Sequence, residues 1–145
     1  MKNPTLGWLK TFMWFVCIFH VTVGVTLNLN IGLKEWVASG LYGASVDWNN
    51  AQFVYILRPL GAFMVALGVM AGVAARNPLA YSGIVNAFVM LFILRALQRL
   101  VFMADTHAAF AIPPGRSLVN MGVMFVLAAS LLILARASAA GSARR

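Results

Sequence analysis

Acidic residues are scarce in this sequence: Glu35, Asp47 and Asp105 are the only three in 145 residues. All three lie outside the long apolar runs, so no run contains a carboxylate that could relay protons through a membrane. The patterns H-E-x-x-H and G-x-S-x-G, typical of zinc peptidases and of serine hydrolases with a nucleophile elbow, are also missing. These absences favour a non-enzymatic protein.

Cysteine and histidine are almost as rare. Cys17 is the only cysteine, which excludes an internal disulfide and a thiolate metal cluster, and we expect it to pack as a small apolar residue. His20 lies inside the first apolar run, whereas His107 lies in a connection, so the two are not placed to ligate one haem together. A single axial histidine stays open, but we expect His20 to be a hydrogen-bonded structural residue and predict no metal site.

Charged residues make up 10% of the chain and hydrophobic residues 62%, against about 25% and 45–50% in soluble proteins. The composition therefore predicts a membrane protein, and the length predicts a single domain over residues 1–145. The formal net charge of +8 comes from basic residues beside or inside apolar runs. This placement indicates membrane topology and anionic lipid, and it argues against nucleic acid as a partner.

Four apolar runs are each close to the 20 or so residues that cross a bilayer as a helix. They cover residues 8–29, 53–75, 79–102 and 117–135. Short connections between them predict an all-α fold, a four-helix transmembrane bundle of up-down topology. We expect a short interfacial helix in the connection 30–50 and a basic flexible tail at 136–145.

The orientation follows from Lys and Arg near the ends of the runs, which favour the cytoplasmic side. Placing both termini inside puts six basic residues there and two in the outer connections. The inner set is Lys2, Lys10, Arg76, Arg136, Arg144 and Arg145, and the outer set is Lys34 and Arg116. The prediction is a multi-pass protein of the inner (cytoplasmic) membrane of a bacterium, with both termini cytoplasmic.

Three arginines then fall inside the outer half of the spans, where charge is costly. Arg95 and Arg99 are four residues apart and share one helix face, and Arg58 enters early in the second span. One interpretation is structural, with Glu35, Asp47 and Asp105 as ion-pair partners. The other is an outward-facing anion pocket, because a planar guanidinium binds two oxygens of a phosphate or carboxylate. Gln98, Asn120 and His20 are the further polar candidates for that pocket.

Small residues line one face of the second span. Gly61, Gly68 and Gly72 recur there, and Gly68 and Gly72 form a G-x-x-x-G pattern that allows close approach of another helix. We expect the side chain of Arg58, three residues before Gly61, to lie on this same face, which we call the glycine seam.

Several short segments resemble the DoxX-like group of four-span bacterial membrane proteins, closest to its uncharacterised members of the domain-of-unknown-function 4345 type. They are Tyr42-Gly43, Arg58-Pro-Leu-Gly61, Gly68, Arg95-Ala-Leu-Gln-Arg99 and Asp105. The fourth span departs from the pattern, with Asn120 where an acidic residue is expected. The resemblance implies a four-helix bundle in the bacterial inner membrane and implies little about activity.

Two functional hypotheses follow. The first is a non-enzymatic accessory subunit, or a binder of an anionic lipid or small molecule, with the lipid bilayer and a larger membrane complex or homo-oligomer as partners. It needs no cofactor. The second is a redox subunit linked to quinone or haem, which would use His20 with the arginines; some relatives in the DoxX-like group are linked to quinone or sulfur redox systems. A carrier is a third and weaker hypothesis, because the chain shows no inverted repeat.

Overall fold

The computed structural model describes residues 4–29 and 31–143, and they form helices joined by short connections. Four of the helices are long and apolar enough to cross a membrane. They are α1 (Pro4–Asn28), α3 (Ala51–Arg76), α4 (Ser82–Val101) and α6 (Pro114–Ala143). The all-α fold with four membrane-spanning helices is thereby confirmed, and the chain is a multi-pass membrane protein.

The bounds of the four helices differ by a few residues from the sequence prediction, and two of the differences have a clear cause. α4 begins at Ser82 rather than at residue 79, because Pro78 lies in the turn that follows α3. α6 continues to Ala143, so residues 136–143, expected as a flexible tail, are helical. The reason is composition: this stretch is rich in alanine, the strongest helix former, and Ser138 is fully buried against the bundle. Residues 144–145 of the expected tail lie outside the described residues.

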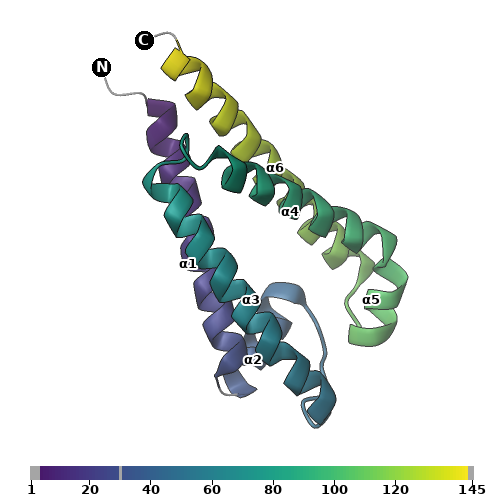
Figure 1. Cartoon of the computed structure of the whole chain (residues 1–145). Helices are drawn as coiled ribbons and strands as arrows, with labels where there is room; N and C mark the ends of the chain where they lie inside the picture. The colour runs from purple at the N-terminus through teal and green to yellow at the C-terminus, as the bar shows by residue number, and fades with distance from the viewer. Residues whose placement is uncertain (1–3, 30, 144–145) are drawn as a thin grey trace.

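The four long helices form two antiparallel pairs, α1 with α3 and α4 with α6 (Figure 1). The pairs meet where α1 begins and α6 ends, which we call the closed end, and diverge toward the other end, the wide end. The start of α1 and the end of α6 therefore lie on one side, as an up-down bundle requires. A core at the closed end, to which all four long helices contribute, joins the pairs. Its largest fully buried side chains are Phe88, Leu9, Met13 and Leu131.

Glycine brings α1 and α3 into backbone contact. A Cβ atom on Gly24 would lie 2.6 Å from the Gly61 carbonyl oxygen, and one on Gly68 would lie 3.0 Å from the Cys17 carbonyl oxygen. A Cβ atom on Gly72 would lie 3.1 Å from Cys17 Sγ. The small residues of α3 thus face a neighbouring helix within the same chain.

Short elements occupy the wide end. α2 (Ile31–Trp36) runs directly into the π-helical turn η1 (Val37–Tyr42), and α5 (Met103–Phe110) follows α4. Gly43 ends η1 with φ 67°, a left-handed conformation that glycine adopts without strain. Two hydrogen bonds connect the segment around η1 to α5 and α6: Ser45 N–H donates to the Phe110 carbonyl of α5 at 2.8 Å, and Arg116 of α6 donates to the Gly40 carbonyl at 2.7 Å.

Candidate functional site

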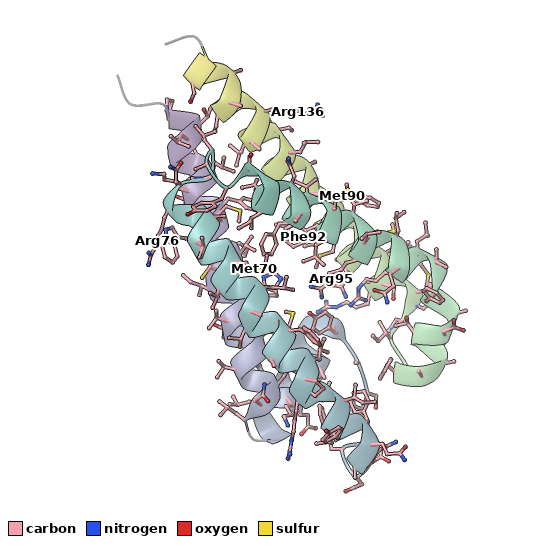
Figure 2. The ribbon with its side chains drawn as sticks, in the orientation of Figure 1. Met70, Arg76, Met90, Phe92, Arg95 and Arg136 are labelled. Atoms are coloured by element: carbon pink, nitrogen blue, oxygen red, sulfur yellow. The ribbon has the colours of Figure 1, made fainter. Side chains whose placement is uncertain are left out.

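Polar candidates from α4 reach into the space between the two helix pairs. Figure 2 shows Arg95 and Phe92 pointing from α4 into this space, whereas Arg76 and Arg136 point away from it near the closed end. Three cavities occupy the space, and Arg95 and Tyr42 line all three. We name them the Arg99 cavity, the Lys34 cavity and the His20 cavity, after a residue that lines only that one.

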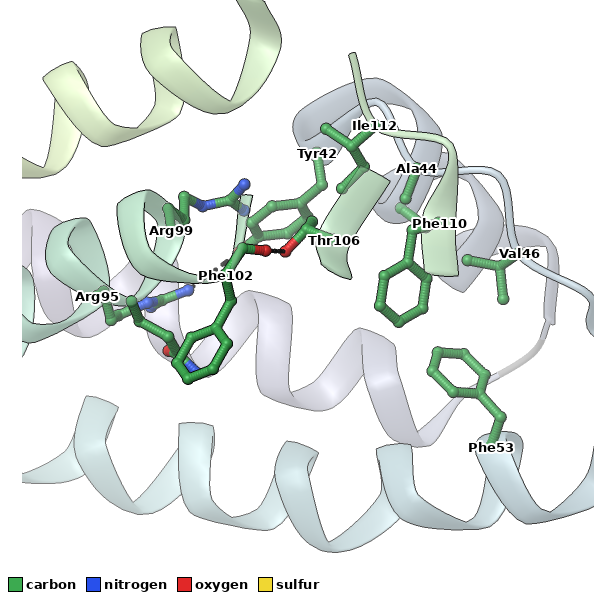
Figure 3. A pocket seen from close by; sticks show the side chains of 12 residues that line it. Tyr42, Ala44, Val46, Phe53, Arg95, Arg99, Phe102, Thr106, Phe110 and Ile112 are labelled. Carbon is green, nitrogen blue, oxygen red and sulfur yellow. Dashed lines mark hydrogen bonds between the residues drawn. The ribbon is translucent and has the colours of Figure 1, made fainter. Parts of the chain in front are cut away.

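The Arg99 cavity lies beneath α5 and has a volume of about 310 Å³. Arg95, Gln98 and Arg99 enter it from α4, and Tyr42 enters from η1 (Figure 3). The rest of its wall is mainly apolar: Ala38, Ala44, Val46, Phe53, Phe102, Thr106, Phe110 and Ile112. Three adjacent polar side chains on the last turns of α4 therefore face one hollow.

Tyr42 lies between the two arginines. Arg95 Nη2 donates a long hydrogen bond of 3.4 Å to Tyr42 Oη, and Arg99 Cζ lies 5.3 Å from the centroid of the Tyr42 ring. The second contact is a cation–π interaction. Neither contact neutralises a charge, and Arg99 Nη1 is buried with no hydrogen-bond partner in the described chain. The pair therefore retains donors and positive charge that an anion would satisfy.

The Lys34 cavity is the largest of the three, at about 510 Å³. Lys34 comes from α2 and is 4% exposed, so its side chain lies inside the protein. Arg95 and Gln98 border the same cavity. Most of the remaining wall is apolar and comes from α1, α3 and α4: Val23, Leu27, Leu57, Leu60, Phe63, Met64, Leu67 and Leu91. The cavity thus combines cations at one side with a long hydrocarbon wall.

The His20 cavity, of about 210 Å³, lies between α1, α4 and α6. His20 is 1% exposed, and its Nδ1 lies 2.8 Å from the Val16 carbonyl oxygen. Because a carbonyl only accepts, Nδ1 carries the proton and Nε2 of the neutral ring is an acceptor. Nε2 is buried without a partner, and so is Asn120 Nδ2 in the same cavity. His20 is thus hydrogen-bonded, as expected of a structural residue, at one ring nitrogen only.

His107 does not join His20. It lies in α5 at the wide end, where its Nδ1 bonds the Ile112 carbonyl at 3.0 Å. Within residues 4–29 and 31–143, no group of three or more His, Cys, Asp or Glu side chains could hold a metal ion. The quinone- or haem-linked alternative stays a prediction.

None of the described residues that line these three cavities is acidic. Glu35, Asp47 and Asp105 are all exposed, and Asp47 Oδ1 instead accepts from the Asn49 N–H at 3.0 Å. In the described chain the only side-chain hydrogen bond that Arg95 donates goes to Tyr42. The structure therefore does not bring the three expected ion-pair partners to the arginines.

Arg58 also stands apart from the other two arginines. Its side chain is exposed on α3 and lines none of the three cavities. Three residues correspond to about 300° around a helix, so Arg58 lies to one side of the seam that Gly61 marks. The other five predicted candidates line the cavities in two groups that share Arg95: Gln98 and Arg99 line the Arg99 cavity with it, and His20 and Asn120 line the His20 cavity with it.

Lys34 and Tyr42 are not among the site residues that the sequence predicts. The sequence places Lys34 only among the basic residues of the outer connections. In the structure, Lys34 and Val37 are buried while Trp36 is 65% exposed. The π-helical turn, which has more residues per turn than an α-helix, then directs Tyr42 inward. The signal available in the sequence was the i, i+3, i+4, i+8 spacing of Lys34, Val37, Ala38 and Tyr42, which places them near one face.

No protein family, curated protein or solved structure matches this chain.

Proposed function

We propose that this membrane protein binds an amphiphilic anion, with the charged head group held by Lys34, Arg95 and Arg99 and the apolar tail in the Lys34 cavity. The observation that carries the proposal is the set of three cations around two adjoining cavities whose walls contain no carboxylate. Charged side chains in a membrane interior are costly unless they are paired. A bound anion would supply the missing partner.

The chemistry of the head group follows from the donors. Two guanidinium groups four residues apart on α4 present forks that match the paired oxygens of a phosphate or carboxylate. Gln98, which borders both cavities, adds an amide donor. A phosphate or carboxylate monoanion or dianion therefore fits this end of the site better than a neutral head group.

The apolar part of the ligand follows from the walls. Leucine, valine, phenylalanine and methionine from three long helices line the Lys34 cavity, and its volume is typical of sites for small organic ligands. A free inorganic anion would leave this surface without a partner. A lipid or another anion with one hydrocarbon chain satisfies both parts of the site.

The location is part of the proposal. We propose the bacterial inner membrane, with the closed end on the cytoplasmic side and the cavities opening toward the outer side. The supporting observation is that basic residues such as Lys10, Arg76 and Arg136 gather near the closed end, as the positive-inside rule expects. The proposal requires no resident cofactor and no catalytic group.

Binding of dodecyl phosphate to protein in a neutral detergent tests the proposal, with dodecanol as the uncharged ligand of equal chain length. Arg95→Gln and Arg99→Gln should each weaken dodecyl phosphate binding about tenfold, since a hydrogen bond to a charged group contributes about 1.5–3 kcal/mol. Arg58→Gln and Arg136→Gln are the matched controls, because both remove an exposed arginine outside the cavities. Equal affinity in all four variants would refute the site.

A further inference from the structure

The His20 cavity has features that the anion site does not explain. It lies between α1, α4 and α6 and shares Arg95 and Tyr42 with the Lys34 cavity. Two of its lining residues, His20 and Asn120, each carry a buried polar atom, Nε2 and Nδ2, that has no hydrogen-bond partner among the described residues. We infer that this cavity binds a phenol, that is, one aromatic ring that carries a hydroxyl group.

The two polar atoms define which group can bind. His20 Nε2 is an acceptor and needs a donor, whereas Asn120 Nδ2 is a donor and needs an acceptor. The two do not bond each other, so one ligand group that satisfies both atoms has to donate to His20 Nε2 and accept from Asn120 Nδ2. A hydroxyl donates one hydrogen bond and accepts others, and therefore satisfies both atoms. A carboxylate cannot donate to Nε2, and an ammonium cannot accept from Asn120.

The walls and the volume define the rest of the ligand. Phe15, Phe19 and Phe92 line the cavity, with aliphatic side chains from α6. Aromatic walls favour an aromatic guest through stacked or edge-to-face contacts. The volume of about 210 Å³ exceeds the roughly 150 Å³ of an apolar protein cavity that holds benzene. A benzene ring with a hydroxyl substituent therefore fits the volume of this cavity.

The phenol site is separable from the proposed anion site. His20 and Asn120 line only the His20 cavity, and Arg99 and Lys34 do not line it. Arg95 and Tyr42 are common to both sites and are for that reason excluded from the test. Failure of one site leaves the expected results for the other unchanged.

The test compares 4-fluorophenol with 4-fluoroanisole by fluorine NMR, on the full chain in a neutral detergent. The methyl ether lacks the donor that His20 Nε2 requires, so the wild-type protein should bind the phenol about tenfold more tightly. His20→Phe retains an aromatic ring without the acceptor and should abolish that preference. Asn120→Leu should reduce the preference for the phenol. His107→Phe is the control: His107 lines none of the three cavities, so its replacement should leave the preference unchanged.

A second measurement needs no variant. The chain has two histidines, so the nitrogen NMR spectrum of histidine-labelled protein resolves His20, and phenol binding should shift the Nε2 signal while the Nδ1 signal stays. Three results would overturn the inference: no saturable phenol binding, equal affinity for phenol and anisole in the wild type, or an unmoved Nε2 signal at phenol saturation.

Discussion

Replacing Gly24 by alanine should separate the two most tightly packed helices. A Cβ atom at this position on α1 would lie 2.6 Å from the Gly61 carbonyl oxygen and 2.8 Å from the Val65 amide nitrogen of α3. Both are backbone atoms, so no side-chain rotation relieves the overlap and the helices themselves must shift. Gly122→Ala is the matched control, since a Cβ atom there meets no atom within 4 Å.

Two opposing effects set the change in the free energy of unfolding that Gly24→Ala causes. Glycine to alanine in a helix gains up to about 1 kcal/mol of intrinsic propensity at either position. Overpacking of a closely packed interior costs about 1–3 kcal/mol, and only Gly24→Ala incurs it. The control variant therefore isolates the packing effect: the free energy of unfolding should be about 1–3 kcal/mol lower for Gly24→Ala than for Gly122→Ala.

Unfolding of the purified variants in mixed detergent micelles, followed by tryptophan fluorescence, measures this difference. A difference of 1 kcal/mol corresponds to about 2–4 °C in melting temperature for a chain of this size. If Gly24→Ala unfolds at the same point as Gly122→Ala, the close α1–α3 contact is wrong, and with it the geometry of every cavity between the helix pairs.

Two further changes test the wide end. Tyr42→Phe removes the hydroxyl but keeps the ring beneath Arg99, and it should lower the free energy of unfolding by less than about 0.5 kcal/mol. Tyr42→Leu removes the cation–π contact as well and should lower it by about 1–2 kcal/mol. Equal losses for the two variants in chemical unfolding would contradict the role of the ring. Gly43→Ala should lower the free energy of unfolding by about 1–2 kcal/mol, because alanine is strained at the left-handed φ of 67°. Gly115→Ala is the control: a Cβ atom there meets no atom within 4 Å, and the loss should be less than about 0.5 kcal/mol. Thermal melts of the two variants would show the difference.

The fold was predictable because its determinants are local. Runs of about 20 apolar residues specify spanning helices, and proline and glycine mark most of their ends. The shared face of Arg95 and Arg99 on α4 was also predictable, because residues four apart lie on the same side of a helix.

What escaped prediction depends on contacts between distant segments. The π-helical turn changes which residues of the 31–42 segment face inward, and no local pattern specifies it. Lys34 therefore looked solvated although it is buried. Gly24 was missed for a similar reason: it lies 17 residues after Gly7, the other glycine of α1, so it belongs to no periodic pattern, and its importance is apparent only against the Gly61 carbonyl.

Native mass spectrometry of the protein, purified gently from its own membrane, tests the central claim most directly. We predict that an amphiphilic phosphate or carboxylate stays bound to the wild type and to Arg58→Gln, and is lost from the Arg95→Gln/Arg99→Gln double variant. The same spectra report any larger complex or homo-oligomer. An uncharged lipid retained equally by all three proteins, or no bound anion in the wild type, would contradict the assignment of Lys34, Arg95 and Arg99 as an anion site.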